Sequence, residues 1–142
     1  MKRASIMLRS VFLLGLAGAL ACSKAPDPES PAPSFRIEDF SRQWVHSIEE
    51  QQSFDDPVQI YRPDGFKEFP PSMYRKRYVF ERDGSAQYLW PSPADAHEMR
   101  PATWKIDAQK SDVIHVQEGD QMVSYQVLEV TPDLLRMRLL TE

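Results

Sequence analysis

The chain has 142 residues, of which 42% are hydrophobic, and 17 basic against 21 acidic side chains give a formal net charge of −4. This acidic balance disfavours binding to a nucleic acid, because a negative surface repels the phosphate backbone. Cys22 is the only cysteine. Because there is no second cysteine, the chain cannot form an intramolecular disulfide. The domain that follows Cys22 likewise has no thiolate for a metal site and no cysteine nucleophile.

Residues 1–21 have the pattern of a secretory signal. Three basic residues precede an apolar run over residues 11–20, and small residues lead into Cys22. The run is too short for a transmembrane helix, which needs roughly 20 apolar residues. We therefore predict a signal peptide over residues 1–21. The chain that remains has 14 basic and 21 acidic side chains, a formal net charge of −7.

The sequence Ala19-Leu20-Ala21-Cys22 resembles the lipobox of bacterial lipoproteins, with Ala19 where that family prefers leucine. The resemblance implies that Cys22 is acylated and becomes the N-terminus of a protein anchored in the cell envelope. Ser23 after the cysteine implies the outer membrane if the host has two membranes. The alternative is an ordinary cleaved signal followed by an incidental cysteine.

Residues 22–34 start with this cysteine and continue as a Pro-rich segment. It contains four prolines and no large apolar side chain. Folding would therefore bury too little apolar surface to offset the conformational entropy lost on ordering the segment. We predict a disordered tether over residues 22–34 that holds a single domain, residues 35–142, off the membrane.

The domain shows short alternating apolar and polar stretches and little helical periodicity, apart from a possible helical turn over residues 35–40. The alternation predicts strands over residues 43–50, 58–62, 75–82, 85–90, 103–108, 112–117, 121–130 and 134–140. Asp83-Gly84 predicts a hairpin turn, and the break in alternation at Leu128 predicts a bulge. Prolines predict loops over 63–73 and 91–101. A meander of this length avoids exposed edges by closing, so we predict an all-β, small antiparallel up-and-down barrel of seven or eight strands.

An early tryptophan, Trp44, a run of hairpins, and Arg136 and Arg138 in the last strand resemble the lipocalin-like superfamily. In lipocalins such a tryptophan packs beneath an arginine at the closed end of the barrel. A closer resemblance, to a bacterial group of uncharacterised lipocalin-like domains, is carried by Trp44-Val45-His46-Ser47, Glu49-Glu50, Tyr61-Arg62-Pro63, Phe69-Pro70-Pro71-Ser72 with Arg75, Phe80, Asp83-Gly84, Pro93-Ala94-Asp95 and Trp104. These resemblances imply a fold and no reaction.

No nucleophile elbow, phosphate-binding glycine loop or metalloprotease helix is present. The segment 95–98, Asp-Ala-His-Glu, could offer metal ligands together with His46 or His115, but the three histidines lack a fixed spacing. We therefore expect no metal site, no cofactor and no enzymatic activity.

Two groups of side chains could form a ligand site. The inward aromatics, which could line a cavity or simply fill the barrel, are Trp44, Tyr78, Phe80, Tyr88, Trp90, Trp104 and Tyr125. Glu49-Glu50 with Arg62 and Arg75 could bind a polar ligand or form exposed ion pairs. The candidate ligand-binding residues are Trp44, His46, Glu50, Tyr61, Arg62, Phe66 and Phe69. Phe66 and Phe69, held among prolines, either cap the core or guard an opening.

Three functions remain open at this point. The first is a monomeric envelope lipoprotein that binds a small apolar or amphipathic ligand. The second is a protein-interaction module, such as an envelope assembly factor or an inhibitor of an extracellular enzyme, acting through loops 63–73 and 91–101. The third is an enzyme with a site of an unfamiliar type.

Overall fold

The computed structural model describes residues 31–89 and 98–141. The predicted signal peptide, Cys22, most of the tether, Trp90 and most of the 91–101 loop lie outside these ranges. Within them, no helix has the length and apolar character needed to cross a bilayer.

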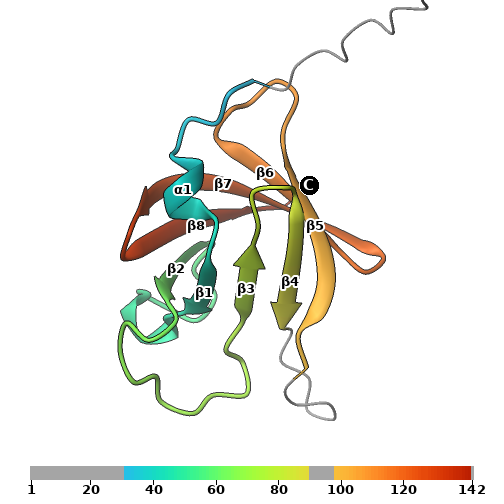
Figure 1. The fold of residues 1–142 in the computed structure, drawn as a ribbon. Coiled ribbons are helices and arrows are strands. Elements are labelled where there is room, and N and C mark those ends of the chain that lie inside the picture. The colour runs from blue at the N-terminus through green and yellow to red at the C-terminus, as the bar shows by residue number, and fades with distance from the viewer. Residues whose placement is uncertain (1–30, 90–97, 142) are drawn as a thin grey trace, which may run out of the picture.

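Nearly all the regular secondary structure of the described residues is β-strand (Figure 1). The elements in chain order are α1 (Ile37–Phe40), β1 (Gln43–His46), η1 (a 3₁₀ turn, Ile48–Glu50), β2 (Val58–Pro63), β3 (Arg77–Phe80), β4 (Ser85–Leu89), β5 (Arg100–Ile106), β6 (Val113–Glu118), β7 (Gln121–Thr131) and β8 (Leu134–Leu140). The eight strands form a closed, all-antiparallel barrel. The predicted fold class is therefore confirmed.

The ring of strands is closed by the first hairpin. Strands β3 to β8 follow one another around the barrel in chain order, and the β1–β2 hairpin fills the remaining gap with β1 beside β3 and β2 beside β8. The segment that joins β2 to β3, residues 64–76, must therefore pass β1 to reach its strand. Figure 1 shows it in green, below the end of β1. We call residues 64–76 the β2–β3 segment.

Two strands, β1 and β5, differ from their predicted ranges by three or more residues at one end, and the others differ by at most two residues. The predicted strand 43–50 ends at His46, because the Ser47 hydroxyl donates to Glu50 Oε2 at 2.6 Å and the chain turns into η1. Strand β5 begins at Arg100, inside the predicted 91–101 loop, because residues 100–102 pair with β4. The predicted bulge in β7 is confirmed as a register shift between Val127 and Glu129.

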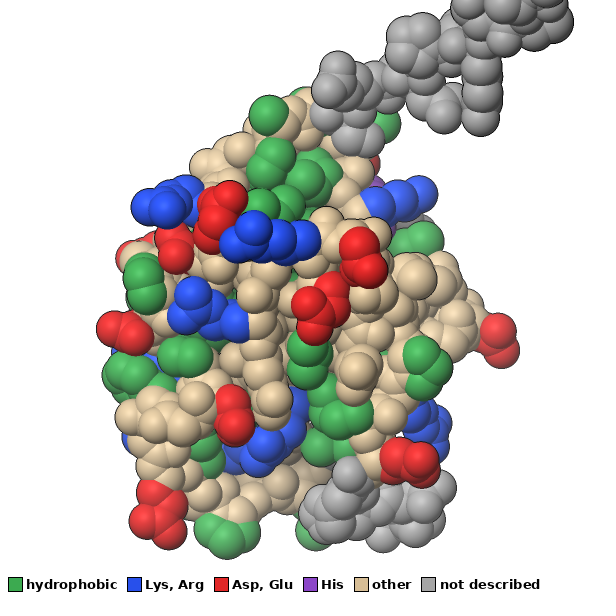
Figure 2. Space-filling model, in the orientation of Figure 1, with side chains coloured by type: hydrophobic (Ala, Val, Ile, Leu, Met, Phe, Trp, Pro, Cys, Tyr) green, Lys and Arg blue, Asp and Glu red, His purple; other side chains and the backbone are tan. Residues whose placement is uncertain are grey.

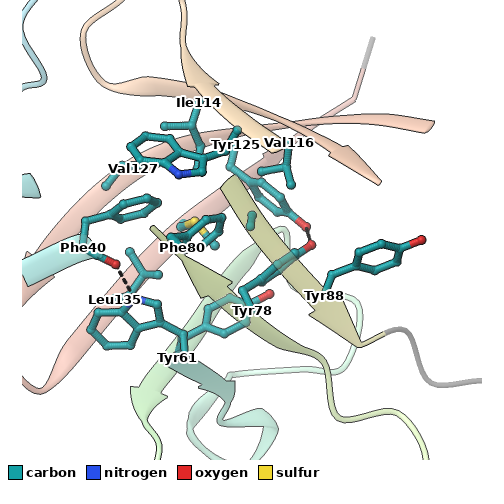
Figure 3. Packing of buried hydrophobic residues seen from close by; sticks show 14 residues of the cluster. Phe40, Tyr61, Tyr78, Phe80, Tyr88, Ile114, Val116, Tyr125, Val127 and Leu135 are labelled. Atoms are coloured by element: carbon teal, nitrogen blue, oxygen red, sulfur yellow. Dashed lines mark hydrogen bonds between the residues drawn. The ribbon is translucent and has the colours of Figure 1, made fainter. Parts of the chain in front are cut away.

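The core is built from aromatic rings that alternate inward along the strands. Phe40 of α1 stacks on Phe80 at a centroid distance of 4.4 Å, and Trp104 lies 4.9 Å from Phe40. Trp44 is fully buried, and its indole N–H donates to the Phe40 carbonyl oxygen at 2.9 Å (Figure 3). Trp44, Phe80 and Trp104 thus belong to one buried cluster, as predicted. Helix α1 plugs the end of the barrel at which β1 begins.

Candidate functional site

Six of the seven predicted ligand-site residues lie near the end of β1 away from α1 or on the β2–β3 segment beside it. Trp44 does not join them, because its ring is part of the core beneath α1. Phe66, on the β2–β3 segment, packs on Arg62 at the end of β2. Each group is described below by the contacts that hold it.

Glu50 is the centre of a charged cluster. Arg62 at the end of β2 donates to Glu50 through Nε at 3.0 Å and through a terminal nitrogen at 2.6 Å, which makes a two-pronged ion pair. Lys67 lies 3.3 Å from the same carboxylate. The hydrogen bond from Arg62 is the main cause that lowers the pKa of Glu50 to about 2. From the sequence, Glu50 and Arg62 could either bind a polar ligand or form an ion pair with each other. The structure shows the ion pair.

Arg75 fastens the β2–β3 segment to β1. Its side chain is only 6% exposed, and it donates to the carbonyl oxygens of His46 at 2.6 Å and Pro70 at 2.7 Å. It also forms an ion pair with Glu49, whose pKa is lowered mainly by this hydrogen bond. The backbone N–H of His46 donates to the Lys76 carbonyl oxygen at 3.0 Å. The segment is therefore held by side-chain and main-chain bonds.

Phe66 and Phe69 pack on cations outside the core cluster. The guanidinium carbon of Arg62 lies 4.7 Å from the Phe66 ring centroid, and that of Arg75 lies 5.1 Å from the Phe69 ring. Lys67 Nζ is 5.3 Å from the same Phe69 ring. Phe66 is exposed and Phe69 is half-buried. Of the two predicted roles, a cap on the core does not match this packing, because neither ring belongs to the core cluster and each packs on a guanidinium group instead.

His46 is buried and stacks on Tyr61, with ring centroids 5.0 Å apart. Its Nε2 is hydrogen-bonded to Gln51 Oε1, while Gln51 Nε2 donates to the Ser53 carbonyl oxygen at 3.2 Å. The Gln51 amide oxygen is thus the acceptor, so His46 Nε2 carries the proton and Nδ1 carries the lone pair. Burial lowers the pKa of His46 to about 4, so the ring is neutral at physiological pH.

A polar network inside the barrel is the main feature that the sequence does not reveal. The Tyr78 hydroxyl donates to the Glu118 carboxylate and lies 2.9 Å from the Tyr125 hydroxyl. Figure 3 shows the two hydroxyl groups pointing towards each other. Glu118 is only 4% exposed, and burial raises the pKa of Tyr78 and of Tyr125 above their usual range.

The alternation of strands predicts Tyr78 and Tyr125 as inward residues, but Glu118 reads as part of the turn Glu118-Gly119-Asp120. In the structure Glu118 is the last residue of β6, and its alternation with Val116 turns it inward. Alternation extended by one pair along β6 is the signal that could have found it. Lys76 lies in the same region, since Glu118 acts on its charge and burial lowers the pKa of its ammonium.

The barrel interior thus has two parts. Beneath α1 it is filled by apolar rings, while farther along the barrel it carries buried tyrosine hydroxyls and a carboxylate. Tyr61 hydroxyl donates to Gln59 Oε1 at 2.7 Å in this second part. Such groups orient the polar end of a ligand by hydrogen bonds. In the described residues no cluster of three or more His, Cys, Asp or Glu side chains is placed to hold a metal ion, and residues 95–97 lie outside those ranges.

Fold and site together define a lipocalin-like type of domain, a closed eight-stranded antiparallel barrel with a polar network inside it. Comparison with protein-family models, with curated protein sequences and with solved structures gives no match to this chain. The lipocalin-like assignment therefore stands on the architecture of the barrel.

Proposed function

We propose that this protein is a lipoprotein of the bacterial cell envelope, anchored through Cys22, whose lipocalin-like barrel binds a small amphipathic ligand without catalysing a reaction inside the barrel. The closer likeness to the uncharacterised bacterial lipocalin-like group belongs to this proposal. One observation carries the ligand assignment, the buried carboxylate of Glu118 with Tyr78 and Tyr125 in the barrel interior.

A buried carboxylate is costly for the fold. Removal of its charge from water costs several kcal/mol, and apolar residues of the same volume would often serve stability equally well. Tyr78, Tyr125 and nearby Lys76 offset part of that cost. Buried ionisable groups of this kind gather at functional sites. Because the interior beneath α1 is filled, the ligand of this proposal places its polar end against Glu118, Tyr78 and Tyr125.

The ligand proposal is tested by titrating the full chain with the apolar fluorescent probe N-phenyl-1-naphthylamine. Saturable binding is expected for the wild type, and Glu118→Gln should weaken it about tenfold, as expected for loss of a charged hydrogen-bond acceptor. Glu129→Gln is the matched control, because Glu129 pairs with Arg136 at 3.2 Å and both side chains are well exposed. Absence of saturable binding to the wild type would remove the ligand function.

The anchor is tested by fractionating host cells that express wild type or Cys22→Ser. Each buried CH₂ of an acyl chain contributes only about 0.8 kcal/mol, so stable anchoring needs at least two chains. We expect the wild type in the detergent phase and the mutant in the aqueous phase. Identical partitioning of the two proteins would contradict lipidation, and membrane fractions of a diderm host would locate the anchor.

A second function, protein interaction, is supported by a separate observation. Phe54, Met73 and Tyr74 are 63%, 64% and 55% exposed, and the rings of Phe54 and Tyr74 are in edge contact at 5.5 Å. Exposed large apolar side chains that gather in one place are typical of interaction sites. Acidic and basic side chains are interspersed on the face that Figure 2 shows. Cross-linking in intact cells should capture a stoichiometric partner whose yield falls with Tyr74→Ala if this function holds.

A further inference from the structure

Three polar side chains on the outer face of the barrel form a hydrogen-bonded chain. Asp107 directly follows β5, His115 lies in β6 and Ser124 lies in β7. His115 Nδ1 is 2.8 Å from Ser124 Oγ, and His115 Nε2 is 2.8 Å from Asp107 Oδ2. All three residues are half-buried. Their order, carboxylate then imidazole then hydroxyl, is that of the serine hydrolase triad.

The carboxylate fixes the tautomer of the imidazole. An ionised carboxylate only accepts hydrogen bonds, so His115 Nε2 carries the proton and Nδ1 presents its lone pair to the Ser124 hydroxyl. The hydrogen bond with His115 is the main cause that lowers the pKa of Asp107 to about 2. Asp107 Oδ1 accepts from the backbone N–H groups of Gln109 at 2.8 Å and Lys110 at 2.9 Å, which hold the carboxylate in place.

The two ring nitrogens are exchanged relative to the usual triad, in which Nε2 faces the serine. The exchange leaves the chemistry of the base unchanged, because the nitrogen that faces the hydroxyl has the lone pair and the other donates to the carboxylate. Cross-strand pairing explains the arrangement. His115 lies opposite Ser124 in β7 and opposite Lys105 in β5. The register of the sheet therefore places Lys105, His115 and Ser124 in one row across three strands.

A cleft adjoins this row. It has a volume of about 290 Å³ and is lined by Thr103, Trp104, Lys105, His115, Gln117 and Met122. Met122 lies two residues before Ser124 in β7, so that both side chains are on the same face of the sheet. The lining combines the exposed apolar side chain of Met122 with the positive charge of Lys105, whereas the ring of Trp104 faces the core. An acyl group fits the first, and a developing oxyanion is stabilised by the second.

We infer that Ser124 is a nucleophile, activated by His115 and with Asp107 as the positioning residue, and that this site acts on small carboxylic esters. The inference goes beyond the proposed ligand function and does not rest on it. Ser124 is on the outer face, whereas its neighbour Tyr125 points into the barrel. The inference departs from the expectation, drawn from the sequence, of a protein without enzymatic activity.

The reaction has two steps. Ser124 Oγ attacks the ester carbonyl carbon while its proton moves to His115 Nδ1. The carbonyl electrons move to the oxygen near Lys105 and return as the bond to the leaving alkoxide breaks. That alkoxide takes the proton from His115, which leaves an acylated Ser124. Water then attacks the acyl carbon and gives a proton to His115, and Ser124 leaves with that proton while the carboxylic acid departs.

The same hydrogen bonds could serve stability alone, by tying the β5–β6 turn to β7. The test therefore uses a reagent that reports on the reactivity of the hydroxyl. The full chain, expressed in its host and extracted with mild detergent, is treated with a fluorophosphonate, which phosphonylates activated serines, and the modified peptide is identified by mass spectrometry. Ser85 is an internal control, since its exposed Oγ hydrogen-bonds to Asp83 at 2.6 Å without a histidine.

We expect labelling at Ser124 and none at Ser85, and Ser124→Ala should abolish it. His115→Gln should slow labelling at least about 100-fold, the usual contribution of a general base. Asp107→Asn keeps the oxygen that accepts from Gln109 and Lys110 but loses the charge. It should therefore slow labelling at least about tenfold while leaving the melting temperature within about 2 °C of wild type.

Two results would overturn the inference. One is labelling of Ser124 no faster than that of Ser85. The other is labelling that His115→Gln and Asp107→Asn leave unchanged while both variants melt cooperatively. If His115→Gln fails to fold, Asp107→Asn decides by itself. The two sites are distinguished by comparing variants. Glu118→Gln should lose probe binding and keep labelling of Ser124, whereas Ser124→Ala should lose labelling and keep probe binding.

Discussion

The guanidinium group of Arg42 lies over the indole ring of Trp44, with its carbon 5.7 Å from the ring centroid. A terminal nitrogen of Arg42 donates to the carbonyl oxygen of Pro132, in the β7–β8 turn, at 2.6 Å. This pair therefore links the first strand to the last hairpin at the end of the barrel that α1 closes. The lipocalin resemblance is based on Arg136 and Arg138 of the last strand. In the structure these two side chains bind Glu129 and Gln126, and the arginine over Trp44 is Arg42.

Trp44→Ala should destabilise the domain by about 3–5 kcal/mol, because it removes a fully buried indole and leaves a cavity. It also leaves the Phe40 carbonyl oxygen without its 2.9 Å donor. Urea unfolding followed by circular dichroism measures the loss. Phe54→Ala is the control, and as an exposed residue it should cost less than about 0.5 kcal/mol. Equal losses in the two variants would contradict the assigned core.

Most strands of the fold could be predicted because alternation records which face of a strand is buried. Tyr78 and Phe80 in β3, and Tyr125 and Val127 in β7, are inward in both the prediction and the structure. The bulge at Leu128 was visible for the same reason, since it interrupts the alternation. Short-range pattern thus specifies the inner face of each strand.

The order of strands around the ring and the partners of polar residues could not be predicted. Nothing local to β1 or β2 says that β1 pairs with β3 and β2 with β8. Tyr78, the partner of Glu118, lies 40 positions away in the sequence. The partners of His115 lie 8 and 9 positions away. Only the register of the sheet brings these side chains together. A hydrogen-bonded histidine between strands has no signature in composition or spacing.

Arg75→Met should destabilise the domain by about 2–3 kcal/mol. Arg75 is buried, and its loss leaves the carbonyl oxygens of His46 and Pro70 without their donor. Arg77→Met is the matched control, because Arg77 forms an exposed ion pair with Asp64 at 3.5 Å, which contributes less than about 1 kcal/mol. Urea unfolding at neutral pH gives both values. A smaller loss for Arg75→Met than for Arg77→Met would show that the β2–β3 segment is held by other contacts.

The double variant Phe66→Ala with Phe69→Ala should lose only about 1–2 kcal/mol. Each ring packs on a guanidinium group near the surface, a contact that contributes about 0.5–1 kcal/mol at exposed sites, and neither belongs to the buried cluster. The affinity for N-phenyl-1-naphthylamine should stay within twofold of wild type. A loss above about 3 kcal/mol would mean that the rings plug the core, and a fivefold change in probe affinity would mean that they gate an opening.

The buried ring of His46 should make the domain less stable as the pH falls from 6.5 towards 4. Burial lowers the pKa of the folded-state imidazole to about 4, whereas in the unfolded chain it keeps its usual value of 6.5. Between these values the unfolded state binds a proton that the folded state does not. The free energy of unfolding therefore falls as the pH is lowered through this window, and below about pH 4 His46 contributes no further change.

The expected loss is about 3 kcal/mol, which corresponds to a pKa difference of about 2.5 between the two states. The groups that act on this ring are Lys76 and Arg75, which lower its pKa, and Gln51 and Glu49, which raise it. Glu50 loses its own stabilising contribution only at lower pH, between 4.5 and about 2. Urea unfolding of wild type and His46→Phe at pH 7 and pH 4.5 isolates His46, because phenylalanine can still stack on Tyr61 and does not titrate. Wild type should lose clearly more stability than the variant between the two pH values, and equal losses would show that His46 accepts its proton in the folded barrel as readily as in the unfolded chain.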